Sequence, residues 1–347
     1  MAVTANGPPE ASLDMKRVAV IGAGAWGTAL AKVLSDKGNR VRLYTRNESH
    51  ASELVRDREN KRYLPGVVVP DVIEPTSSLE AALEGAGLVL WVVPSHALRD
   101  TLEMARTFLP TDAVLVSASK GIENDTLMLM GEVFEDVLGP LVKNRLTVLS
   151  GPSFAKEVAA GIPTNIVVAS SNSSLSQEVQ RDFATERLRV YSSDDPKGVE
   201  VGGALKNVIA IAAGACDGLG FGHNTRAALI TRGLAEIARI AIAKGGNVLS
   251  LAGLAGMGDL VLTCTAELSR NRTVGFELGR GKSLDDVLAS LGHVAEGVRT
   301  AKSAHDLAEK LDVELPICNE VYAVLYRGKA AQKAVEELLT RPLKKEW

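Results

Sequence analysis

The apolar residues of this 347-residue chain follow two patterns, and the change between them near Asp194 constrains the fold most. Before Asp194, short runs of Val, Leu, Ile and Ala alternate with segments of helical period. Such alternation predicts right-handed strand–helix–strand crossovers and a mainly parallel, doubly wound α/β sheet. The predicted strands are 17–23, 40–44, 88–93, 113–118, 146–149, 165–169 and 188–192, with helices at 27–37, 78–84, 97–108, 126–138, 153–160 and 174–186.

After Asp194 no apolar run predicts a strand, and helical periodicity continues to the end of the chain. We therefore expect a flexible tail over 1–14, an α/β domain over 15–194 and an all-helical domain over 195–347, which suits the length. The predicted helices of the second domain are 196–216, 225–244, 256–263, 271–279, 283–291, 297–311, 316–326 and 330–339.

Composition excludes several classes of protein. The 39 Lys and Arg residues nearly balance the 42 Asp and Glu residues, so we expect no polybasic surface and no nucleic-acid partner. The three cysteines, Cys216, Cys264 and Cys318, are too few and too far apart for a disulfide framework or a zinc site. Their number fits a reducing compartment, so we expect a cytoplasmic protein without a resident metal.

The most apolar long stretch of the chain covers residues 199–219 and is interrupted by Lys206, Asn207 and Asp217. These polar residues favour a buried helix over a membrane span. The first fourteen residues are small and polar, without the apolar core of a targeting segment. The sequence therefore predicts no membrane-spanning segment.

A glycine-rich turn over residues 22–27, GAGAWG, follows the first predicted strand and opens the first predicted helix. In this context Gly22 allows the tight turn, Gly24 lets a pyrophosphate approach the backbone, and Gly27 permits close helix–strand packing. The unpaired N–H groups of the helix N-terminus would then face the phosphates. The pattern predicts a dinucleotide site, and the alternative is a tight turn without a ligand.

The end of the second predicted strand bears on the choice of cofactor. NAD sites usually place an Asp or Glu about 20 residues beyond the glycine motif, to bind the ribose 2′-hydroxyl. Here the strand ends at Arg46 with no acid, and a guanidinium group is suited to a 2′-phosphate. The sequence favours NADP, whereas the nearby Glu48 and the alternative of a solvated surface arginine keep NAD open.

Lys206 lies in an otherwise apolar predicted helix, where its neighbours one turn away are Gly202, Gly203, Ile209 and Ala210. Desolvation on such a face lowers the pKa of a lysine, so that it can act as a general base near neutral pH. The alternative is a lysine that extends from the domain edge into water.

Three further segments carry polar groups where ligands often bind. Lys120 follows an apolar strand, at the sheet edge where α/β proteins bind ligands, although it could also face solvent. Asp259 follows a glycine-rich segment and precedes a helix, as either a site acid or an N-cap. The run 269–271 combines an arginine with small polar side chains, which suits a phosphate or carboxylate, or else forms an exposed loop. The five histidines are scattered and suggest neither a triad nor a metal cluster.

Seven segments, taken in order, carry a resemblance to a known family. They are GAGAWGTALA (22–31), SKGIE (119–123), SGPSFAKEVA (150–159), ALKNVIAIAAG (204–214), GLAGMGDLVLTC (253–264), SRNRTVG (269–275) and VAEGVRTA (294–301). The chain from 17 to 327 resembles the bacterial type of NAD(P)-dependent sn-glycerol-3-phosphate dehydrogenase. The resemblance implies a Rossmann domain followed by an all-α C-terminal domain like that of 6-phosphogluconate dehydrogenase. Ala25 departs from the serine that the family often has, which removes one possible hydroxyl contact to the cofactor phosphates.

The resemblance also implies roles for individual residues. Lys206 is implied to be the general acid/base, together with Lys120 and Asp259 as catalytic residues. The implied substrate contacts are Lys120, Gly151, Ser153, Lys206, Asn207, Asp259, Thr263, Ser269, Arg270 and Asn271. The implied cofactor contacts are Gly22, Gly24, Ala25, Trp26, Gly27, Arg46, Lys120, Ala155, Arg270, Val294 and Glu296.

The reaction that the resemblance implies is the reversible NAD(P)-dependent oxidation of sn-glycerol 3-phosphate to dihydroxyacetone phosphate. In cells the implied direction is reduction, which supplies glycerol 3-phosphate for phospholipid synthesis, and the implied assembly is a homodimer. Two alternatives stay open. One is a related NADP-dependent dehydrogenase of a 3-hydroxy acid or a ketopantoate-like substrate. The other is a non-catalytic NADP-sensing module, which leaves Lys206 in its apolar helix unexplained.

Overall fold

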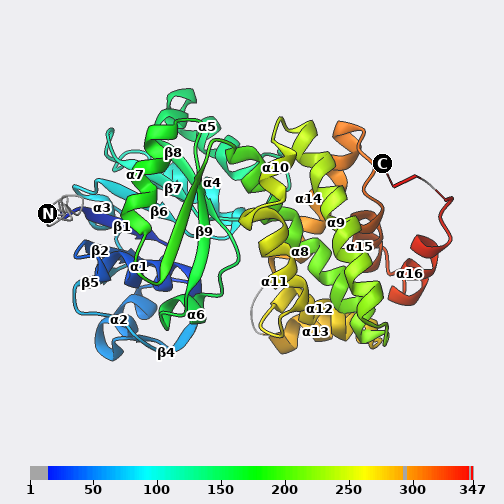
Figure 1. Cartoon of the computed structure of the whole chain (residues 1–347). Helices are drawn as coiled ribbons and strands as arrows, with labels where there is room; N and C mark the ends of the chain where they lie inside the picture. Colours follow the sequence, from blue (N-terminus) through cyan, green and yellow to red (C-terminus); the bar gives the residue numbers. More distant parts are fainter. Residues whose placement is uncertain (1–14, 292–294, 344, 347) are drawn as a thin grey trace, which may run out of the picture.

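The computed structural model describes residues 15–291, 295–343, 345 and 346. It has an α/β half and a helical half that lie side by side (Figure 1). The predicted fold class is confirmed, because a mainly parallel sheet is followed by helices alone. The predicted tail, 1–14, lies outside the described residues, and the division of the domains at 194/195 stays a prediction.

An eight-stranded sheet forms the centre of the α/β half, in the order β10-β9-β8-β7-β6-β1-β2-β5. The chain moves outward from β1 through β2 on one side and continues through β6 on the other. Ligands of open α/β sheets bind at such a switch point, outside the carboxyl ends of the strands. The strands are β1 (Arg17–Ile21), β2 (Arg40–Tyr44), β5 (Ile73–Thr76), β6 (Leu88–Trp91), β7 (Val114–Ser117), β8 (Leu146–Ser150), β9 (Thr164–Ala169) and β10 (Leu188–Ser193).

Helices cover both faces of this sheet (Figure 1). Val18 and Val20 of β1 pack towards one face, and Ala19 and Ile21 pack towards the other. This burial on both sides explains the continuous apolar runs of the sequence. The first face is covered by α1 (Ala25–Asp36) and α7 (Ser173–Phe183), and the second by α3 (Leu79–Leu83), α4 (Ser95–Ala105) and α5 (Met130–Leu138).

The predicted crossover between the strands at 146–149 and 165–169 is wrong. Strand β9 runs antiparallel to β8, and β10 then pairs in parallel with β9. The helix between them, α6 (Ala155–Ala159), has five residues and rises only about 7.5 Å. A five-residue strand spans about 17 Å. This helix is therefore too short to carry the chain back to the end of the sheet where a parallel strand would have to begin.

The sequence also failed to predict the elements of residues 48–76, which are α2 (Glu48–Asp57), β3 (Glu59–Asn60), β4 (Leu64–Val68) and β5. Helix α2 is mostly polar, and its start depends on the Asn47 side chain, which accepts a hydrogen bond from the backbone N–H of His50 at 2.9 Å. Strand β5 contains Pro75, which cannot donate to a neighbouring strand, and accordingly lies at the edge of the sheet.

Helix α8 (Pro196–Gly218) runs through the middle of the helical half. Gly214 and Gly275 allow its backbone to touch that of α12, because a Cβ on either glycine would overlap a carbonyl group of the other helix. Among the described residues α8 alone is long and apolar enough to cross a membrane, yet 83% of its most apolar window is buried inside the protein. Packed around it are α9 (His223–Ala243), α10 (Val248–Leu251), a π-helical turn (Leu254–Gly258), α11 (Asp259–Thr265), α12 (Arg270–Gly279), α14 (Glu296–Leu311) and α15 (Pro316–Tyr326). Outside these, α13 (Leu284–Leu291) packs against α12, and α16 (Ala331–Leu339) packs against α12 and α15.

Candidate active site

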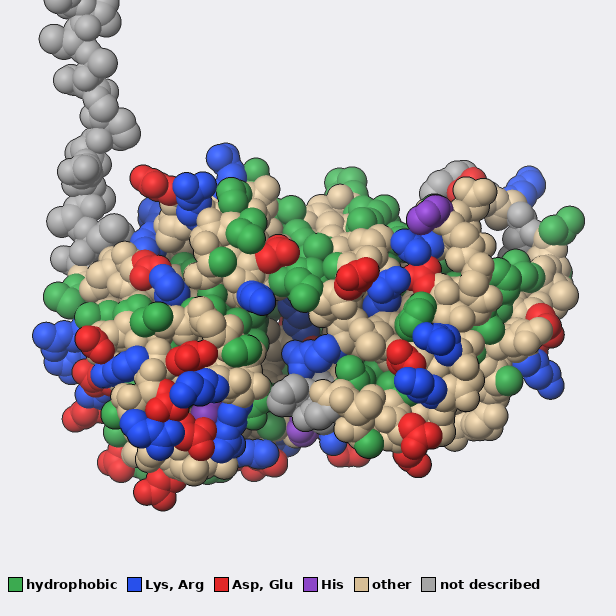
Figure 2. All heavy atoms as spheres, turned by 90° about the horizontal axis from the view of Figure 1, so that it is seen from below, with side chains coloured by type: hydrophobic (Ala, Val, Ile, Leu, Met, Phe, Trp, Pro, Cys, Tyr) green, Lys and Arg blue, Asp and Glu red, His purple; other side chains and the backbone are tan. Residues whose placement is uncertain are grey.

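Three charged side chains from distant parts of the chain meet where the two halves join. Lys120 follows β7, Lys206 lies in the middle of α8, and Asp259 is the first residue of α11. The Nζ atom of Lys206 lies 2.5 Å from Oδ1 of Asp259, and the Nζ atom of Lys120 lies 2.7 Å from Oδ2. One carboxylate therefore bridges two ammonium groups, one from each half of the molecule. Figure 2 shows Lys and Arg side chains gathered around a hollow between the two halves.

The burial of these three side chains decides between the alternatives that the sequence left open. The side chains of Lys206 and Asp259 are only 10% and 2% exposed, and that of Lys120 is 16% exposed. Neither lysine extends into bulk water. Asp259 is not an N-cap, because Gly258 occupies that position and the carboxylate binds the two lysines instead.

The buried cluster changes the proton affinities of its members. Burial lowers the pKa of Lys206 to about 8; the attraction of Asp259 offsets this only in part, and the charge of Lys120 adds to the lowering. Burial alone would raise the pKa of Asp259, but the two ammonium groups outweigh it and hold that pKa below its usual value. Asp259 is therefore ionised at neutral pH. The pKa of Lys206 lies close enough to neutral pH for its ammonium group to release a proton there.

Thr263 fixes the direction of the Lys206 ammonium. It lies one turn after Asp259 on α11, so both side chains face α8. Lys206 Nζ donates to Thr263 Oγ1 at 3.0 Å, and this hydroxyl donates to the backbone oxygen of Asp259 at 2.6 Å. Among the described side chains, Asp259 and Thr263 are the acceptors for Lys206, so one of its three N–H groups can bind another molecule.

A hydrogen-bonded network beside Lys206 joins three helices. Asn271 of α12 donates to the side-chain oxygen of Asn207 at 2.9 Å and accepts from the backbone N–H of Gly297 at 2.9 Å. Asn207 donates to Glu296 at 3.4 Å. Burial raises the pKa of Glu296, and the charges of Lys120, Lys206 and Arg270 oppose this rise. Asn207 and Asn271 thus connect α8 and α12 to the start of α14.

Of the run 269–271, the structure leaves Arg270 free to bind a ligand. Ser269 is buried and caps α12, since its hydroxyl accepts from the backbone N–H of Arg272 at 3.3 Å. Asn271 is buried in the network described above. Arg270 is exposed at the first position of the helix, and no acceptor for its guanidinium group occurs among the described residues. The run is therefore a capped helix start and not an exposed loop.

The loop after β8 brings the backbone of Gly151 to the same edge of the sheet. Gly151 has a φ of +136°, and a Cβ there would lie 2.9 Å from the Cα of Ile166, so only glycine fits. Ser153 donates to the Gly151 carbonyl at 3.1 Å, and Ala155 begins α6. This loop and Lys120 therefore approach the helical half from neighbouring strands, β8 and β7.

The glycine-rich turn has the shape that a dinucleotide needs. Gly22 has a φ of +119° and a Cβ would press against the Val92 carbonyl, while Gly27 packs against the Gly22 carbonyl. Gly24 is the N-cap of α1 with open space beside it, and no side chain caps the helix. The N–H groups at the start of α1, including those of Ala25 and Trp26, are thus available to phosphate groups.

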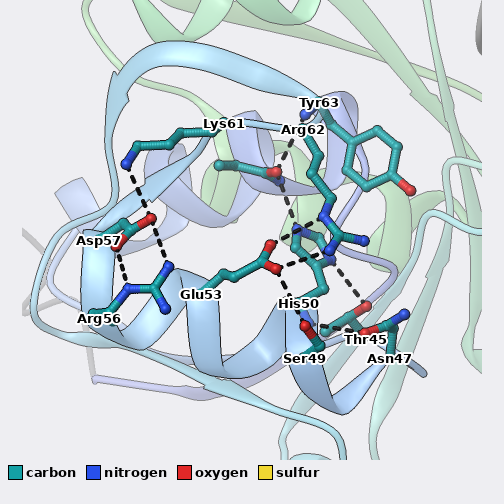
Figure 3. Close-up of polar contacts among 11 residues, drawn as sticks. Thr45, Asn47, Ser49, His50, Glu53, Arg56, Asp57, Lys61, Arg62 and Tyr63 are labelled. Carbon is teal, nitrogen blue, oxygen red and sulfur yellow. Dashed lines mark hydrogen bonds and ion pairs between the residues drawn. The ribbon is translucent and has the colours of Figure 1, made fainter.

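The sequence did not predict a role for His50 and Asn60, which support the glycine-rich turn through buried hydrogen bonds. Asn60 donates to the Ala23 carbonyl at 2.9 Å and to Thr28 at 2.7 Å. His50 lies between Asn60, at 3.1 Å, and Thr45, at 3.2 Å; Figure 3 shows it directed at Thr45. Both side chains are buried, so they fix the glycine-rich turn relative to the end of β2. Neither residue carries a local pattern that would have revealed this role.

Arg46 is exposed after the end of β2, and no hydrogen-bond or ion-pair acceptor for it occurs in the described part of the chain. Its charge reaches His96 at the start of α4, as does that of Arg299 on α14; burial first and then these two arginines lower the pKa of His96. Cationic side chains from both halves thus gather beside the turn. Val294, which the predicted site includes, lies outside the described residues. Among the described residues, no group of three His, Cys, Asp or Glu side chains could hold a metal ion.

Comparison with protein families finds two matches that together span most of the chain. Residues 17–176 match the model of the NAD-dependent glycerol-3-phosphate dehydrogenase N-terminus, and residues 195–336 match that of the C-terminus. The chain is 50% identical over 331 residues to glycerol-3-phosphate dehydrogenase (NAD(P)+) of Citrifermentans bemidjiense, covering 95% of this chain and 99% of the relative.

Solved structures agree with these matches. Glycerol-3-phosphate dehydrogenase from Coxiella burnetii superimposes with a TM-score of 0.90 at 40% identity, covering 94% of this chain and 99% of that one. A ketopantoate reductase from Ralstonia eutropha covers 92% of this chain and 99% of its own, with a TM-score of 0.58 and 18% identity. That second likeness concerns the fold alone.

Proposed function

The chain belongs to the NAD-dependent glycerol-3-phosphate dehydrogenase family, and from this premise we propose how its residues perform the reaction. The enzyme is an NAD(P)-dependent oxidoreductase, and its reaction is the reversible oxidation of sn-glycerol 3-phosphate to dihydroxyacetone phosphate. The observation that supports the assignment of residues is the buried Lys206 ammonium, bound to Asp259 beside Lys120 at the junction of the two halves.

Lys206 is the general acid/base. In the oxidative direction its neutral amine takes the proton of the C2 hydroxyl, and in the reductive direction its ammonium returns a proton to the C2 oxygen. A pKa of about 8 suits both directions, because each protonation state is then accessible near neutral pH. Asp259 and Thr263 orient the amine, and the remaining N–H position faces the substrate.

Lys120 and Asn207 hold the C2 oxygen while negative charge develops on it. Lys120 lies 2.7 Å from Asp259 and comes from the α/β half, whereas Asn207 follows Lys206 on α8. Gly151 and Ser153 contact the substrate from the loop after β8.

Arg270 at the start of α12 holds the phosphate of the substrate. The family resemblance implies that Ser269, which caps this helix, and Asn271, which fixes it to α8 and α14, belong to the same phosphate site. A guanidinium group at a helix N-terminus suits a dianionic phosphate, because the helix dipole adds to the charge. Binding the phosphate away from the reacting carbon fixes that carbon in position, which accounts for much of the rate that an enzyme gains from orientation.

The glycine-rich turn and the start of α1 would hold the dinucleotide, which when bound accepts or donates the hydride. Ala155, Glu296 and Val294 would close over it, as the family resemblance implies. We propose NADP as the preferred form, because Arg46 has no acceptor in the described part of the chain and can bind a 2′-phosphate. NAD remains a substrate in this proposal, since the family relatives are named for both.

The test is a substrate comparison with purified protein. Oxidation of NADPH and of NADH is followed with dihydroxyacetone phosphate, ketopantoate and a 3-keto acid in parallel. We expect turnover with dihydroxyacetone phosphate alone, faster with NADPH. Turnover with ketopantoate instead would replace the proposal by the related dehydrogenase. Binding of NADPH without any oxidation would replace it by a sensing module.

We further propose the setting of the enzyme. It is cytoplasmic, reduces dihydroxyacetone phosphate to supply glycerol 3-phosphate for phospholipid synthesis, and acts as a homodimer. We place the boundary of its cofactor-binding and substrate domains at 194/195, between β10 and α8. Size-exclusion chromatography with light scattering tests the dimer, and a monomeric mass would refute it.

A further inference from the structure

The mechanism above leaves one buried acid of the interface unused. Glu200 lies on α8 and is only 8% exposed. Glu200, Gly203 and Lys206 follow one another at intervals of three residues, so each lies next to the following one on the surface of the helix. Gly203 thus lies between Glu200 and the general base, which are about two turns apart along α8.

Glu200 connects the two halves of the molecule. Its Oε1 atom accepts a hydrogen bond of 2.6 Å from the backbone N–H of Gly131, in the first turn of α5. That N–H has no partner within its own helix, because it belongs to the first turn. Glu200 of the helical half thus accepts a hydrogen bond from an otherwise unpaired N–H group at the start of α5 in the α/β half. The second carboxyl oxygen of Glu200 can bind another partner.

A small space of about 10 Å³ lies beside this carboxyl group. Its lining includes Ser119, Lys120, Ser150, Glu200 and Gly203. This volume is close to the smallest that can hold one water molecule, and a buried water needs two to four polar partners. Ser150 supplies one of them, because its Oγ atom is buried and has no hydrogen-bond partner among the described residues.

The same space adjoins the side chain of Lys120. A Cβ built on Gly203 would lie 2.9 Å from Ser150 Oγ and 3.6 Å from Lys120 Cδ, so both side chains lie against this glycine. Lys120 thus extends across α8 from the space beside Glu200 to the carboxylate of Asp259. Whatever fills the space supports the stem of a residue that binds the reacting oxygen.

The charges around Glu200 determine its protonation. It faces Glu132 and Glu135 of α5, Lys244 of α9 and, across the space, Lys120. Burial raises the pKa of Glu200 to about 8; the Gly131 bond opposes this rise, Glu132 adds to it, and Lys244 opposes it. Lys244 is also bound to Glu132 at 2.7 Å. The raised pKa favours the protonated carboxyl group, whose O–H can donate a hydrogen bond.

We propose that Glu200 is a positioning residue, which binds one buried water that also binds Ser150 and thereby supports Lys120 in the active site. The inference rests on the proposed function for the role of Lys120. A glutamine at 200 reproduces the neutral acid, because its oxygen can accept from Gly131 and its amide N–H can donate to the water.

The experiment compares Glu200→Ala with Glu200→Gln in the full-length protein. We expect Glu200→Ala to lower kcat about tenfold, since small displacements of positioned groups have effects of this size. The Kd for NADPH, measured by fluorescence, should not change, and Glu200→Gln should restore kcat. Ser150→Ala, which removes only a hydroxyl, should lower kcat in the same way if Glu200→Ala folds poorly.

Glu236 provides the matched control. It is also a buried acid of the helical half, and its carboxylate accepts from the backbone N–H groups of Ile317 and Cys318 at 2.7 and 3.1 Å. We expect Glu236→Ala to lower the melting temperature and leave kcat of the folded enzyme unchanged. An unchanged kcat in both Glu200→Ala and Ser150→Ala would overturn the proposal, as would a Glu200→Gln enzyme as slow as Glu200→Ala.

A second readout needs no turnover and separates this proposal from the proposed function. Backbone hydrogen exchange of residues 117–122 and 148–152 should speed up in Glu200→Ala and Ser150→Ala but not in Glu200→Gln. If the wild-type protein fails to reduce dihydroxyacetone phosphate, the proposed function is wrong, while this exchange pattern still tests the positioning. Equal exchange in all variants would refute the positioning itself.

Discussion

Two buried carboxylates, one packed against helix α8 and one in its last turn, each bridge two cations. Asp259 binds the ammonium groups of Lys206 and Lys120. Eleven residues after Lys206, Asp217 binds the guanidinium groups of Arg226 and Arg272, each with a shortest N–O distance of 2.7 Å. The two carboxylates are similarly buried, with side chains 2% and 6% exposed. The clusters differ in the chemistry of their cations.

This difference separates a site for proton transfer from a structural connection. A desolvated ammonium group can lose a proton near neutral pH, whereas a guanidinium group in a protein remains charged. Arg226 and Arg272 each bind one oxygen of Asp217 through two nitrogen atoms, which fixes α9 and α12 against the end of α8. The lysine cluster makes fewer bonds and keeps an N–H of Lys206 for the substrate.

The largest expected effect is that of exchanging one cation for the other. In Lys206→Arg the positive charge persists, but the group can no longer take or return a proton. We expect kcat for dihydroxyacetone phosphate reduction to fall by about 10³-fold, as in Lys206→Ala, because general acid/base catalysis contributes factors of this order. The Kd for NADPH, from fluorescence titration, should stay at the wild-type value.

The reciprocal exchange in the other cluster is the control. Arg272→Lys keeps a positive charge beside Asp217 and should change kcat by less than about threefold, because no proton moves there. Near-normal turnover of Lys206→Arg would show that Lys206 is not the acid/base. The two clusters would then have to be regarded as equivalent structural connections.

Asp217→Asn tests the structural side of the comparison. The substitution leaves two largely buried guanidinium groups without their counter-charge, which for buried ion pairs costs about 3 kcal/mol of unfolding free energy. Urea unfolding followed by circular dichroism should show a lower midpoint with an unchanged m-value. Turnover per folded molecule should persist. A loss of stability below about 1 kcal/mol would mean that this cluster contributes no more than surface ion pairs do.

Part of the lysine cluster could be predicted from the sequence, because the surroundings of Lys206 within its own helix are a local feature. A lysine among glycines and aliphatic residues within one helix already implies desolvation, and the structure gives Lys206 a lowered pKa. The glycine-rich turn is likewise local, since its strand, turn and helix are consecutive. The positive φ of Gly22 and the packing of Gly27 against it agree with the roles that the spacing predicted.

The rest could not be predicted because it depends on contacts between distant segments. Asp259 meets Lys206 across 53 residues and Lys120 across 139, and no local pattern distinguishes it from an N-cap. Asp217 has no sequence motif, although it holds two arginines. The reversal of β9 depends on the short α6, and the elements of 48–76 depend on Asn47 and on the sheet edge, where Pro75 is tolerated.

Arg270 extends the comparison to cations that have no carboxylate partner in the described part of the chain. Because it is exposed and, by the proposed function, binds the substrate phosphate, Arg270→Ala should raise the KM for dihydroxyacetone phosphate by about 30-fold, within the range for a charged hydrogen bond. The value of kcat should change much less. Steady-state kinetics at saturating NADPH measures both. A fall in kcat with an unchanged KM would assign Arg270 to the transition state instead of phosphate binding.

The pH dependence of the two directions tests whether the lysine cluster titrates. Oxidation needs the neutral amine of Lys206, so its rate should rise about tenfold per pH unit well below a pKa of about 8 and then level off. Reduction needs the ammonium, so its rate should fall as the pH passes through the same value. Profiles of kcat with buffers of constant ionic strength give both curves. Two flat profiles between pH 6 and 9 would show that proton transfer by Lys206 does not limit the rate in either direction.

Arg46 gives the smallest expected effect, because it is exposed and acts on one cofactor only. In NADP the extra phosphate offers it a charge-assisted bond, whereas NAD has only a hydroxyl at that position. Arg46→Ala should therefore raise the KM for NADPH about tenfold, the value for about 1.4 kcal/mol, and leave the KM for NADH within error. Raising the salt concentration should shrink the difference, since exposed charges are screened. Equal changes for both cofactors would mean that Arg46 contributes only to the general positive potential that it shares with Arg299. Arg46 would then contribute to the affinity for the phosphates of both cofactors without discriminating between NADP and NAD.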